Sequence, residues 1–434
     1  MASQRQLVQL FGGNDGAPAA FNDLVRIRQE RIVNRKLRSR RAVALGAVVL
    51  FLTIGAAWLL SLPLARDVAV APRITQAEAD ATLAALKPPK RRRPIIAIIA
   101  INDATETTDY IMPYGILRRA DVGDVVTLAT KPGPVNLYPA FKVEPDATVA
   151  DFDARYPEGA DYVIVPAMSR DDDPLVLEWI RGQATKGAII VGVCAGAKVV
   201  AAAGLLNGKR ATTHWYYLKE LRDKHPSIRY VADRRLVVDR GVVTTTGITA
   251  SMPMSLTLIE AIAGRDKAEA VARNLGLLRW DASHTSDAFK FTRPFALTAM
   301  GNTLAFWSRE QFGIELVPGI DEVSLALVAD AWSRTYRSRT VTFAGSANAQ
   351  QTANGIRILP DQVAANWEER QRILTSWQRQ PAIALNETLR AISDRYGKRT
   401  ADLVATQLEY GTQWTAARRL GEPRLSSGIC AGQV

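Results

Sequence analysis

One of the chain's two cysteines stands where chemistry is expected. Cys194 lies in Gly-Val-Cys-Ala-Gly, residues 192–196, which follows an apolar β-branched run and precedes an alanine-rich segment. A nucleophile flanked by glycines at this spacing is typical of a sharp strand-to-helix turn that projects the middle side chain out of a sheet. The alternative is a buried cysteine that serves only as a small hydrophobic residue.

A thiol at such a turn is placed at the start of a helix. The positive end of the helix dipole and the free N–H groups there favour the thiolate. The backbone N–H groups of Ala195 and Gly196 are expected to hold a developing oxyanion. The turn therefore predicts Cys194 as a nucleophile with a backbone oxyanion site beside it.

The segments around this turn predict a doubly wound α/β domain. Apolar runs without a polar face are typical of parallel strands buried on both sides, and helical segments separate them. The expected strands are 95–101, 124–130, 162–167 and 188–193, and the expected helices are 108–120 and 174–186. Ligands in such sheets bind at the carboxyl ends of the strands, which is where Cys194 falls.

The segment after Cys194 continues the domain. A helix is expected to residue 204, followed by Lys-Arg-Ala-Thr-Thr-His-Trp at 209–215 and a hairpin that turns at Asp239-Arg240-Gly241. Helices are expected at 251–264 and 265–277, and the domain is expected to end near Trp280. The predicted fold is thus a mostly parallel sheet flanked by helices, over residues 94–280.

The stretch from Val193 to Trp215 resembles the ThiJ/PfpI superfamily, relatives of the class I glutamine amidotransferases. It is most similar to the branch of isonitrile hydratase-like proteins and of the amidase-like domains of AraC-type regulators. The resemblance covers about residues 94–280 and implies a flavodoxin-like fold. It implies site roles for Cys194, for Asp109 four positions before a proline, and for His214 twenty positions after the cysteine.

Asp109 and His214 each have a structural alternative. A carboxyl group beside a thiolate tends to stay protonated and could exchange a proton during addition at sulfur. Asp109 could equally be an acid in the first turn of its helix. His214 could equally be a structural histidine at a strand end. Both alternatives stay open at the level of the sequence.

Two departures from the resembled families narrow the chemistry. Ala195 stands where the peptidase-like members carry histidine and where isonitrile hydratases usually carry threonine, so a protease is not expected and hydratase activity is in doubt. Residues 281–434 contain no readable helix-turn-helix, so a transcription factor is not expected. His214, His225 and His284 are too dispersed for a metal-ligand spacing, and we expect no metal or cofactor.

The N-terminal part of the chain indicates a membrane anchor. Residues 42–65 contain no charged side chain and are long enough to cross a bilayer as a helix. Eight basic residues lie between Arg26 and Arg41, which predicts a cytoplasmic tail at 1–41 and the main domain on the periplasmic side of the inner membrane. A cleaved signal peptide is the alternative, and the basic run at 87–94 weakens the orientation.

The net charge of +12 is concentrated at this end. Residues 1–93 carry sixteen Lys and Arg against six Asp and Glu, so they account for +10 of it. The nearly neutral remainder argues against a nucleic-acid partner. Cys194 and Cys430 do not indicate a disulfide framework. A linker is expected at 66–93.

Residues 281–434 are expected to be an α/β extension packed on the first domain. Two stretches, from Val125 and from Thr340, align without a gap at an offset of 215 residues and share five identities. This predicts a partial repeat that does not reach a cysteine turn. The five pairs are Val126/Val341, Thr127/Thr342, Ala129/Ala344, Pro145/Pro360 and Asp146/Asp361.

Two classes of function follow. In one, Cys194 attacks a small electrophile with Asp109 moving a proton, as in hydratase, lyase or amidase-like chemistry. In the other, the same pocket is a non-catalytic sensor of a small molecule or of oxidation. In either case we expect a small-molecule ligand, a membrane contact through 42–65 and a homo-oligomer.

Overall fold

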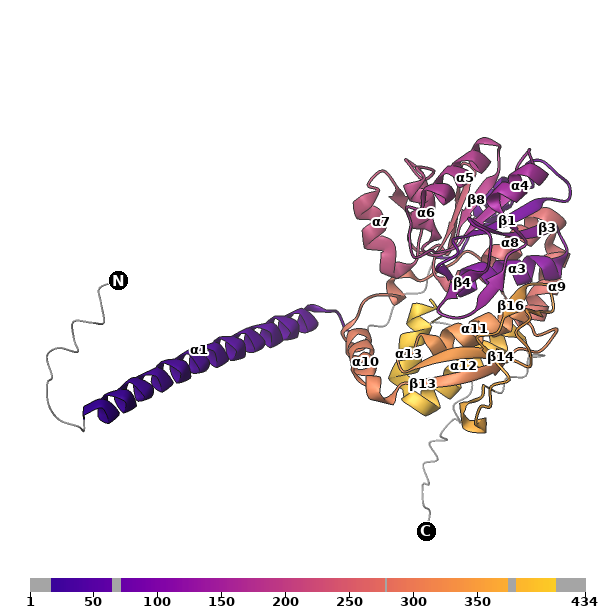
Figure 1. Ribbon diagram of the computed structural model, residues 1–434. Helices are drawn as coiled ribbons and strands as arrows, with labels where there is room; N and C mark the ends of the chain where they lie inside the picture. The colour runs from indigo at the N-terminus through magenta and orange to yellow at the C-terminus, as the bar shows by residue number, and fades with distance from the viewer. Residues whose placement is uncertain (1–16, 65–71, 278, 374–379, 411–434) are drawn as a thin grey trace, which may run out of the picture. The chain divides into compact units, whose positions relative to one another are not determined.

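The computed structural model of the chain describes residues 17–64, 72–277, 279–373 and 380–410. Cys430 and most of the basic-tail residues before Ala17 lie outside these ranges. The chain divides into two compact units, Met1–Pro63 and Leu64–Val434, which are described separately. Figure 1 labels the helices and strands.

The first unit is built on one long helix, α1 (Ala17–Ser61). Its second part, Val43–Ser61, is long and apolar enough to cross a membrane by length and composition. A signal sequence near an N-terminus satisfies the same criterion. The helix exposes large side chains such as Phe51 and Leu52.

The second unit is built around a seven-stranded mixed sheet. The strand order is β11-β12-β8-β7-β1-β3-β6, and β11 runs antiparallel to β12 while the other neighbouring pairs are parallel. The strands are β1 (Ile95–Ala100), β3 (Asp124–Ala129), β6 (Ala147–Thr148), β7 (Tyr162–Val165), β8 (Ile189–Gly192), β11 (Leu236–Asp239) and β12 (Val242–Thr245).

Helices cover both faces of this sheet, which is why β1 is apolar at every position. Ile96 and Ile98 pack into one core, and Ile95, Ala97 and Ile99 pack into another on the opposite face. The first core contains α3 (Thr107–Ala120), α8 (Ser251–Ala263) and α9 (Arg265–Leu275). The second contains α4 (Val149–Arg155), α5 (Pro174–Thr185), α6 (Gly196–Ala202) and the start of α7 (Leu218–Lys224). Figure 1 shows these two layers.

Much of the expected linker at 66–93 is folded. Thr75 caps α2 (Gln76–Ala85), which packs against α8. Glu78 pairs with Arg234 at 2.6 Å, and the Tyr162 hydroxyl donates to the Leu86 carbonyl at 2.6 Å. The described residues from Pro72 onward therefore belong to the second unit.

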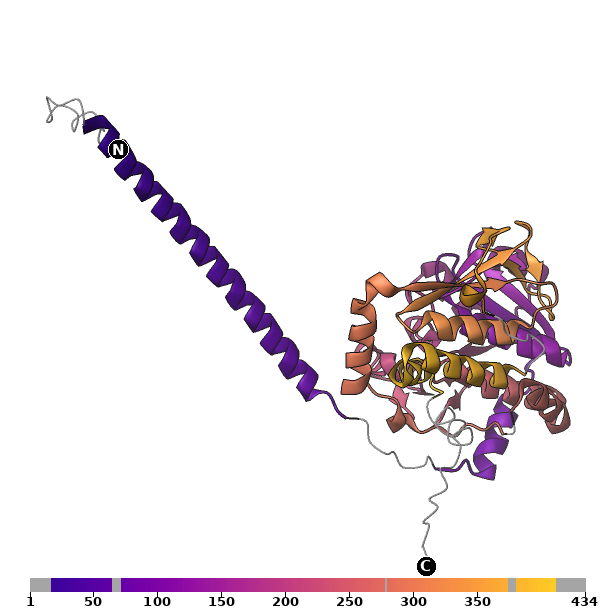
Figure 2. The ribbon, with the colours of Figure 1, turned by 90° about the horizontal axis from the view of Figure 1, so that it is seen from below.

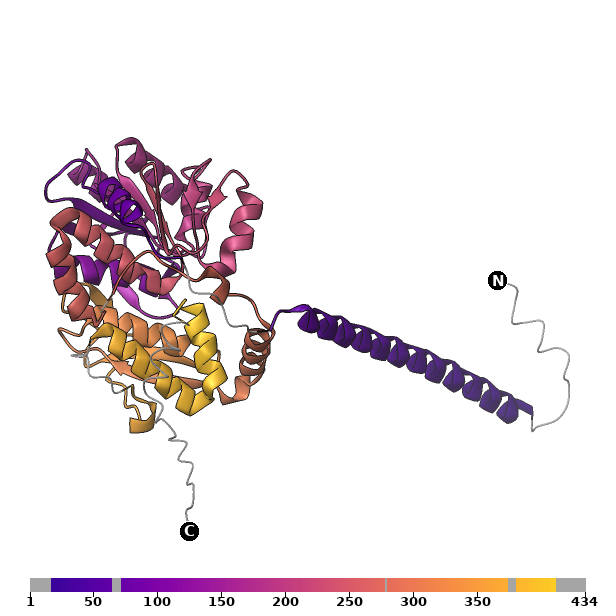
Figure 3. The same ribbon diagram turned by 180° about the vertical axis from the view of Figure 1, so that it is seen from behind.

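The C-terminal part packs against the first sheet's helices within the same compact unit (Figures 2 and 3). Its three-stranded parallel sheet has the order β13-β14-β17, and its helix α11 packs on both α3 and α12. The elements are α10 (Arg293–Leu304), β13 (Glu310–Glu315), α11 (Glu322–Ser333), β14 (Ser338–Ala344), β17 (Gln362–Val363), α12 (Pro381–Tyr396) and α13 (Lys398–Gln407).

A five-stranded sheet joins the two halves of the second unit. Its order is β15-β16-β5-β4-β2, and β16 pairs antiparallel with β5. These strands are β2 (Thr105–Glu106), β4 (Val135–Tyr138), β5 (Lys142–Glu144), β15 (Gln350–Gln351) and β16 (Arg357–Leu359). A parallel pair, β9 (Arg210–Ala211) and β10 (Arg229–Tyr230), lies outside both sheets.

Candidate functional site

Cys194 lies directly after β8 and before α6, with a left-handed φ of 57°. A non-glycine residue in this region is strained and is held there by its surroundings. Its N–H donates to Thr245 Oγ1 at 3.0 Å, and its carbonyl accepts from Thr213 Oγ1 at 3.0 Å. A Cβ on Gly196 would meet the Val165 carbonyl oxygen at 2.0 Å, so glycine is required for the sharp turn.

The thiol of Cys194 is buried, with 4% of the residue exposed. Burial, and next the charges of Asp109 and Glu106, raise the pKa of Cys194 well above its usual range. This corrects the expectation of a resting thiolate, because desolvation and two nearby carboxyl groups outweigh the start of a short helix. The thiol therefore stays protonated until a base accepts its proton.

Asp109 is fully buried in the first turn of α3 but does not cap the helix. The N-cap is Glu106, whose side chain accepts the Asp109 N–H at 2.5 Å. Asp109 Oδ2 accepts the N–H of Ala167 at 3.1 Å, and Oδ1 has no hydrogen-bond partner among the described residues. Burial and Glu106 raise the pKa of Asp109 well above its usual range, so this carboxyl holds a proton.

Glu106 is tied to the C-terminal part of the chain by Arg334. Arg334 Nη2 donates to Glu106 Oε1 at 2.7 Å, and Nε donates to Asp330 Oδ1 at 2.7 Å. Burial and Asp330 raise the pKa of Glu106 to about 7, and Arg334 opposes this rise. Burial alone would lower the pKa of Arg334, but Asp330 and Glu106 raise it, so the guanidinium stays charged.

Three buried acids thus share one guanidinium next to Cys194. Burial also raises the pKa of Asp330. Groups this close titrate as a set, so at neutral pH the cluster holds protons that can move between carboxyl groups. The arrangement can accept a proton from the thiol and return one to a ligand.

His214 lines the same cavity as Cys194, but both ring nitrogens are engaged elsewhere. Nε2 lies 2.9 Å from the Gln407 carbonyl, and Nδ1 accepts the Tyr216 N–H at 3.2 Å. A carbonyl only accepts and an N–H only donates, so the proton sits on Nε2. Burial lowers the pKa of His214, which keeps the ring neutral. The structural alternative fits this geometry, and the ring is not directed at the thiol as a base.

The expected oxyanion donors differ in availability. The Gly196 N–H donates to the Val193 carbonyl at 2.7 Å, which removes it from the predicted pair. The Ala195 N–H is directed at Cys194 and acts to lower the thiol pKa, although burial outweighs it. The backbone donor at the sulfur is therefore Ala195.

Cys194 opens on a cavity of about 840 Å³ with mainly apolar walls. The polar groups on its wall include Glu106, Ser169, His214 and Arg334. Large side chains from both halves of the second unit surround them. They include Tyr138, Met168, Trp215, Phe291, Phe295 and Met300. A cavity of this size and character fits a small, mostly apolar molecule.

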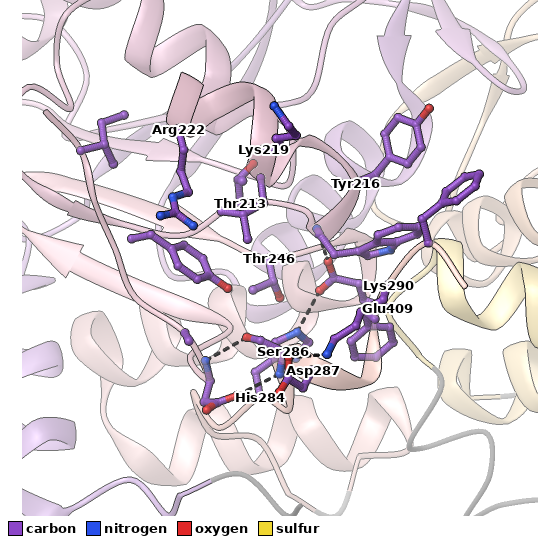
Figure 4. A pocket seen from close by; sticks show the side chains of 18 of the residues that line it. Thr213, Tyr216, Lys219, Arg222, Thr246, His284, Ser286, Asp287, Lys290 and Glu409 are labelled. Atoms are coloured by element: carbon purple, nitrogen blue, oxygen red, sulfur yellow. Dashed lines mark hydrogen bonds and ion pairs between the residues drawn. The ribbon is translucent and has the colours of Figure 1, made fainter. Parts of the chain in front are cut away.

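A second cavity, of about 940 Å³, shares Trp215 with the first and contains Glu409 and His284 (Figure 4). Glu409 accepts the Trp215 N–H at 2.9 Å and lies 3.3 Å from His284 Nε2. Burial would raise the pKa of Glu409, but His284, His214 and the Trp215 N–H lower it to about 2. His284 is buried and stacks on Phe289, so it is a structural residue here. His225 is not part of either wall.

Residues 95–261 match the DJ-1/PfpI family. This part of the chain is a DJ-1/PfpI domain. Among curated proteins, the chain is 40% identical over 105 residues to an isonitrile hydratase of Pseudomonas putida, which covers 24% of this chain and 44% of that protein. It is 24% identical over 184 residues to protein dj-1beta of Drosophila melanogaster, which covers 41% of this chain and 95% of that protein.

A regulator and a solved structure are also similar to the DJ-1/PfpI domain. The HTH-type transcriptional regulator CdhR of Pseudomonas aeruginosa is 32% identical over 113 residues, which cover 26% of this chain and 33% of the regulator. The crystal structure of Drosophila melanogaster DJ-1beta aligns with 23% identity and a TM-score of 0.39, over 43% of this chain and all of that one. The chain thus spans less than half of the isonitrile hydratase and of the regulator.

Sequence reasoning missed the residues that surround Cys194 from outside the DJ-1/PfpI motif. Glu106 lies three positions before Asp109, where the spacing of a capping acid could have identified it. Arg334 lies beyond the DJ-1/PfpI domain, and the offset of 215 that relates it to Arg119 was the available signal. Within the described residues there is no group of three or more potential metal ligands.

Proposed function

We propose that this chain is a membrane-anchored DJ-1/PfpI protein whose Cys194 adds to a small, mostly apolar electrophile. The observation that carries the proposal is a strained, buried cysteine that opens on the 840 Å³ cavity beside Glu106 and Asp109. Cavity walls of tyrosine, tryptophan, phenylalanine and methionine favour an apolar body, and the carboxyl cluster favours a carbon–heteroatom multiple bond at its reactive end.

The proposed step is a thiol addition in which atoms balance. Cys194 S–H is the nucleophile: a bond forms between sulfur and the electrophilic carbon, and the π bond from that carbon to its heteroatom breaks. A carboxylate of the Glu106–Asp109 cluster accepts the thiol proton, and the heteroatom receives one in return. The Ala195 N–H lies on the sulfur side of the turn and assists the developing negative charge.

The similarity to an isonitrile hydratase supports hydratase- or lyase-like chemistry, and amidase-like chemistry would use the same first step. His214 serves this site by shaping the cavity wall, since its nitrogens bind Gln407 and Tyr216. A sensor of small molecules is the second candidate, because stable addition without release would report the ligand. The raised pKa of Cys194 disfavours a sensor of oxidation alone, since the thiolate is the oxidised form.

The membrane part of the proposal rests on α1. Val43–Ser61 would cross the inner membrane once, with the basic segment before it in the cytoplasm and the DJ-1/PfpI domain in the periplasm. Protease added to intact spheroplasts should then digest the domain. Protection of the domain would overturn the orientation, and release of the whole chain by salt or alkali would overturn the anchor.

The test of the chemistry uses the full chain in detergent and a panel of small aldehydes, isonitriles and amides. Mass spectrometry should find adducts on Cys194 or turnover for at least one apolar member. Cys194→Ser should abolish both, and Cys430→Ser, which removes the other cysteine, should not. Reaction that persists in Cys194→Ser, or an unlabelled Cys194 with every probe at every pH, would overturn the proposed function.

A further inference from the structure

We propose that residues 310–363 are a shortened second copy of the unit at residues 95–148, that the two copies pair as two subunits would, and that the second copy supplies Arg334 to hold Glu106 beside Cys194. The role given to Arg334 rests on the proposed function of Cys194. The pairing of the copies does not.

The first observation is the order of the elements. Six elements of the first copy recur in the second at an offset of 215 residues, with start positions that agree to within one residue. The pairing of β13 on β14 is shifted by one residue relative to that of β1 on β3, so the copies have diverged in detail. The recurring pairs are β1/β13, α3/α11, β3/β14, β4/β15, β5/β16 and β6/β17.

The second observation is a side-chain arrangement that occurs in both copies. Thr127 N–H and Oγ1 donate to Asp146 Oδ2 at 2.8 and 2.7 Å, and the Asp146 N–H donates back to Thr127 Oγ1 at 3.0 Å. Thr342 and Asp361 make the same three bonds at 2.8, 2.9 and 3.0 Å. Both pairs join equivalent strands, so the repeat extends from backbone to hydrogen bonds.

The third observation is that the copies meet about a local two-fold axis. In the antiparallel pair β5/β16, Val143 faces Ile358, which is its own equivalent at the offset of 215. The neighbouring pairs are exchanged by the same rotation: Glu144 faces Arg357 and Lys142 faces Leu359. Self-pairing of equivalent residues is the mark of an isologous interface, here contained in one chain.

The helices α3 and α11 obey the same symmetry. Each begins with a capping acid, Glu106 or Asp321, which accepts the N–H three residues on. Each capping acid also binds an arginine from the C-terminal end of the other helix. Arg334 donates to Glu106, and Arg119, which is equivalent to Arg334, donates to Asp321.

The symmetry ends at the chemistry. The first copy continues through β7 and β8 to Cys194, whereas the second copy is followed, after β17, by α12 and α13 among the described residues. Arg119–Asp321 is therefore a docking pair alone. Arg334–Glu106 is both a docking pair and part of the cavity wall with Cys194. Arg334 is a positioning residue: it acts on the thiol through Glu106.

The groups that face Glu106 define what removal of Arg334 does. They are Asp330 and Arg334 from the α11 side, Thr108 and Asp109 from α3, and Cys194 from the turn. Without the guanidinium, Glu106 would take up a proton more readily, so its carboxylate would form only at higher pH. The proton acceptor for the thiol would then be missing at neutral pH.

The experiment compares Arg334→Gln with its symmetric control Arg119→Gln in the full chain. Both should lower the midpoint of thermal unfolding, because each breaks one docking pair. Arg334→Gln should also slow iodoacetamide labelling of Cys194 at neutral pH by about tenfold or more, the ratio set by one pKa unit, and move the pH profile upward. Arg119→Gln should keep the wild-type pH profile.

Arg334→Lys keeps a positive charge and guards against failure to fold. It should restore much of the labelling rate at neutral pH if Arg334 acts by its charge on Glu106. Equal changes of the pH profile in Arg119→Gln and Arg334→Gln, or no change in either, would overturn the role of Arg334. If wild-type Cys194 never labels, the proposed function and the role of Arg334 both fail, while the unfolding midpoints still test the pairing: unchanged midpoints in both variants would overturn it.

Discussion

Arg334 reaches Glu106 across 228 positions of sequence and donates a 2.7 Å hydrogen bond to its carboxylate. The contact places a cation from outside the DJ-1/PfpI domain against an acid that raises the pKa of the cysteine inside it. Asp109, Asp330 and Glu106 surround that cation, so the state of Cys194 depends on protons shared among buried carboxyl groups.

Cys194→Ser should remove labelling by thiol reagents and destabilise the fold by only about 1–3 kcal/mol, because the new hydroxyl is buried among carboxyl groups. Intact-protein mass spectrometry measures the labelling, and thermal unfolding measures the stability. Cys430→Ser is the matched control and should keep Cys194 reactive. A variant at residue 194 that fails to fold would assign the cysteine a packing role.

Glu106→Gln should change how stability depends on pH. Folding raises the pKa of Glu106 from 4.5 to about 7, so the folded state binds the proton more tightly and loses stability as pH rises through this window. The wild type should lose about 3 kcal/mol of folding free energy across it from this group, and Glu106→Gln should not. Denaturant unfolding at several pH values checks this.

The matched control for Glu106 is Asp321, its equivalent in the second half of the chain. Asp321→Asn removes the corresponding capping acid and docking pair but lies away from Cys194. It should lower stability while leaving the slope between pH 4.5 and 7 as in the wild type. The same change of slope in both variants would show that docking, and not the buried cluster, causes the pH dependence.

Glu409→Gln should act in the opposite pH direction. Folding lowers the pKa of Glu409 from 4.5 to about 2, so its contribution is fully present above pH 4.5 and is lost as pH falls toward 2. The variant should therefore unfold more easily at neutral pH, by about 3 kcal/mol, and differ little from wild type in strong acid. Glu369→Gln, at an exposed position, is the control and should change neither.

Gly196→Ala should disrupt the turn, because the added Cβ would meet the Val165 carbonyl oxygen at 2.0 Å. Separation of β7 from α6 would disturb Cys194 and lower stability by more than about 2 kcal/mol. Gly182→Ala is the control, since Gly182 lies in α5 with no atom within 4 Å of an added Cβ among the described residues. That change should stabilise by about 0.5–1 kcal/mol, as measured by unfolding.

The sheet could be predicted because its signals are local. Ile95–Ala100 and Ile189–Gly192 are apolar throughout, and this pattern alone identifies strands covered on both faces. The left-handed conformation of Cys194 follows from its flanking glycines in the same way. The mixed character of the sheet arises at β11, which the turn at Arg240 connects to its neighbour.

The environment of Cys194 could not be predicted, because it depends on contacts between distant segments. The motif indicates a helix start that favours thiolate, but the charges that decide the pKa come from Asp109 and Glu106. His214 falls at the position that the resemblance implies, yet Gln407, near the end of the described chain, binds its nitrogen. Spacing along the sequence contains no information about either contact.

The completion of the site by residues near the C-terminus has a consequence for synthesis. Glu106 and Cys194 leave the ribosome well before Arg334, and Gln407 and Glu409, which bind His214 and Trp215, come later still. At about 5–20 residues per second, the delay between Cys194 and Arg334 is on the order of ten seconds. During that interval the nascent chain holds an acidic pocket without its cation, so a truncated product would contain the cysteine motif but an incomplete site.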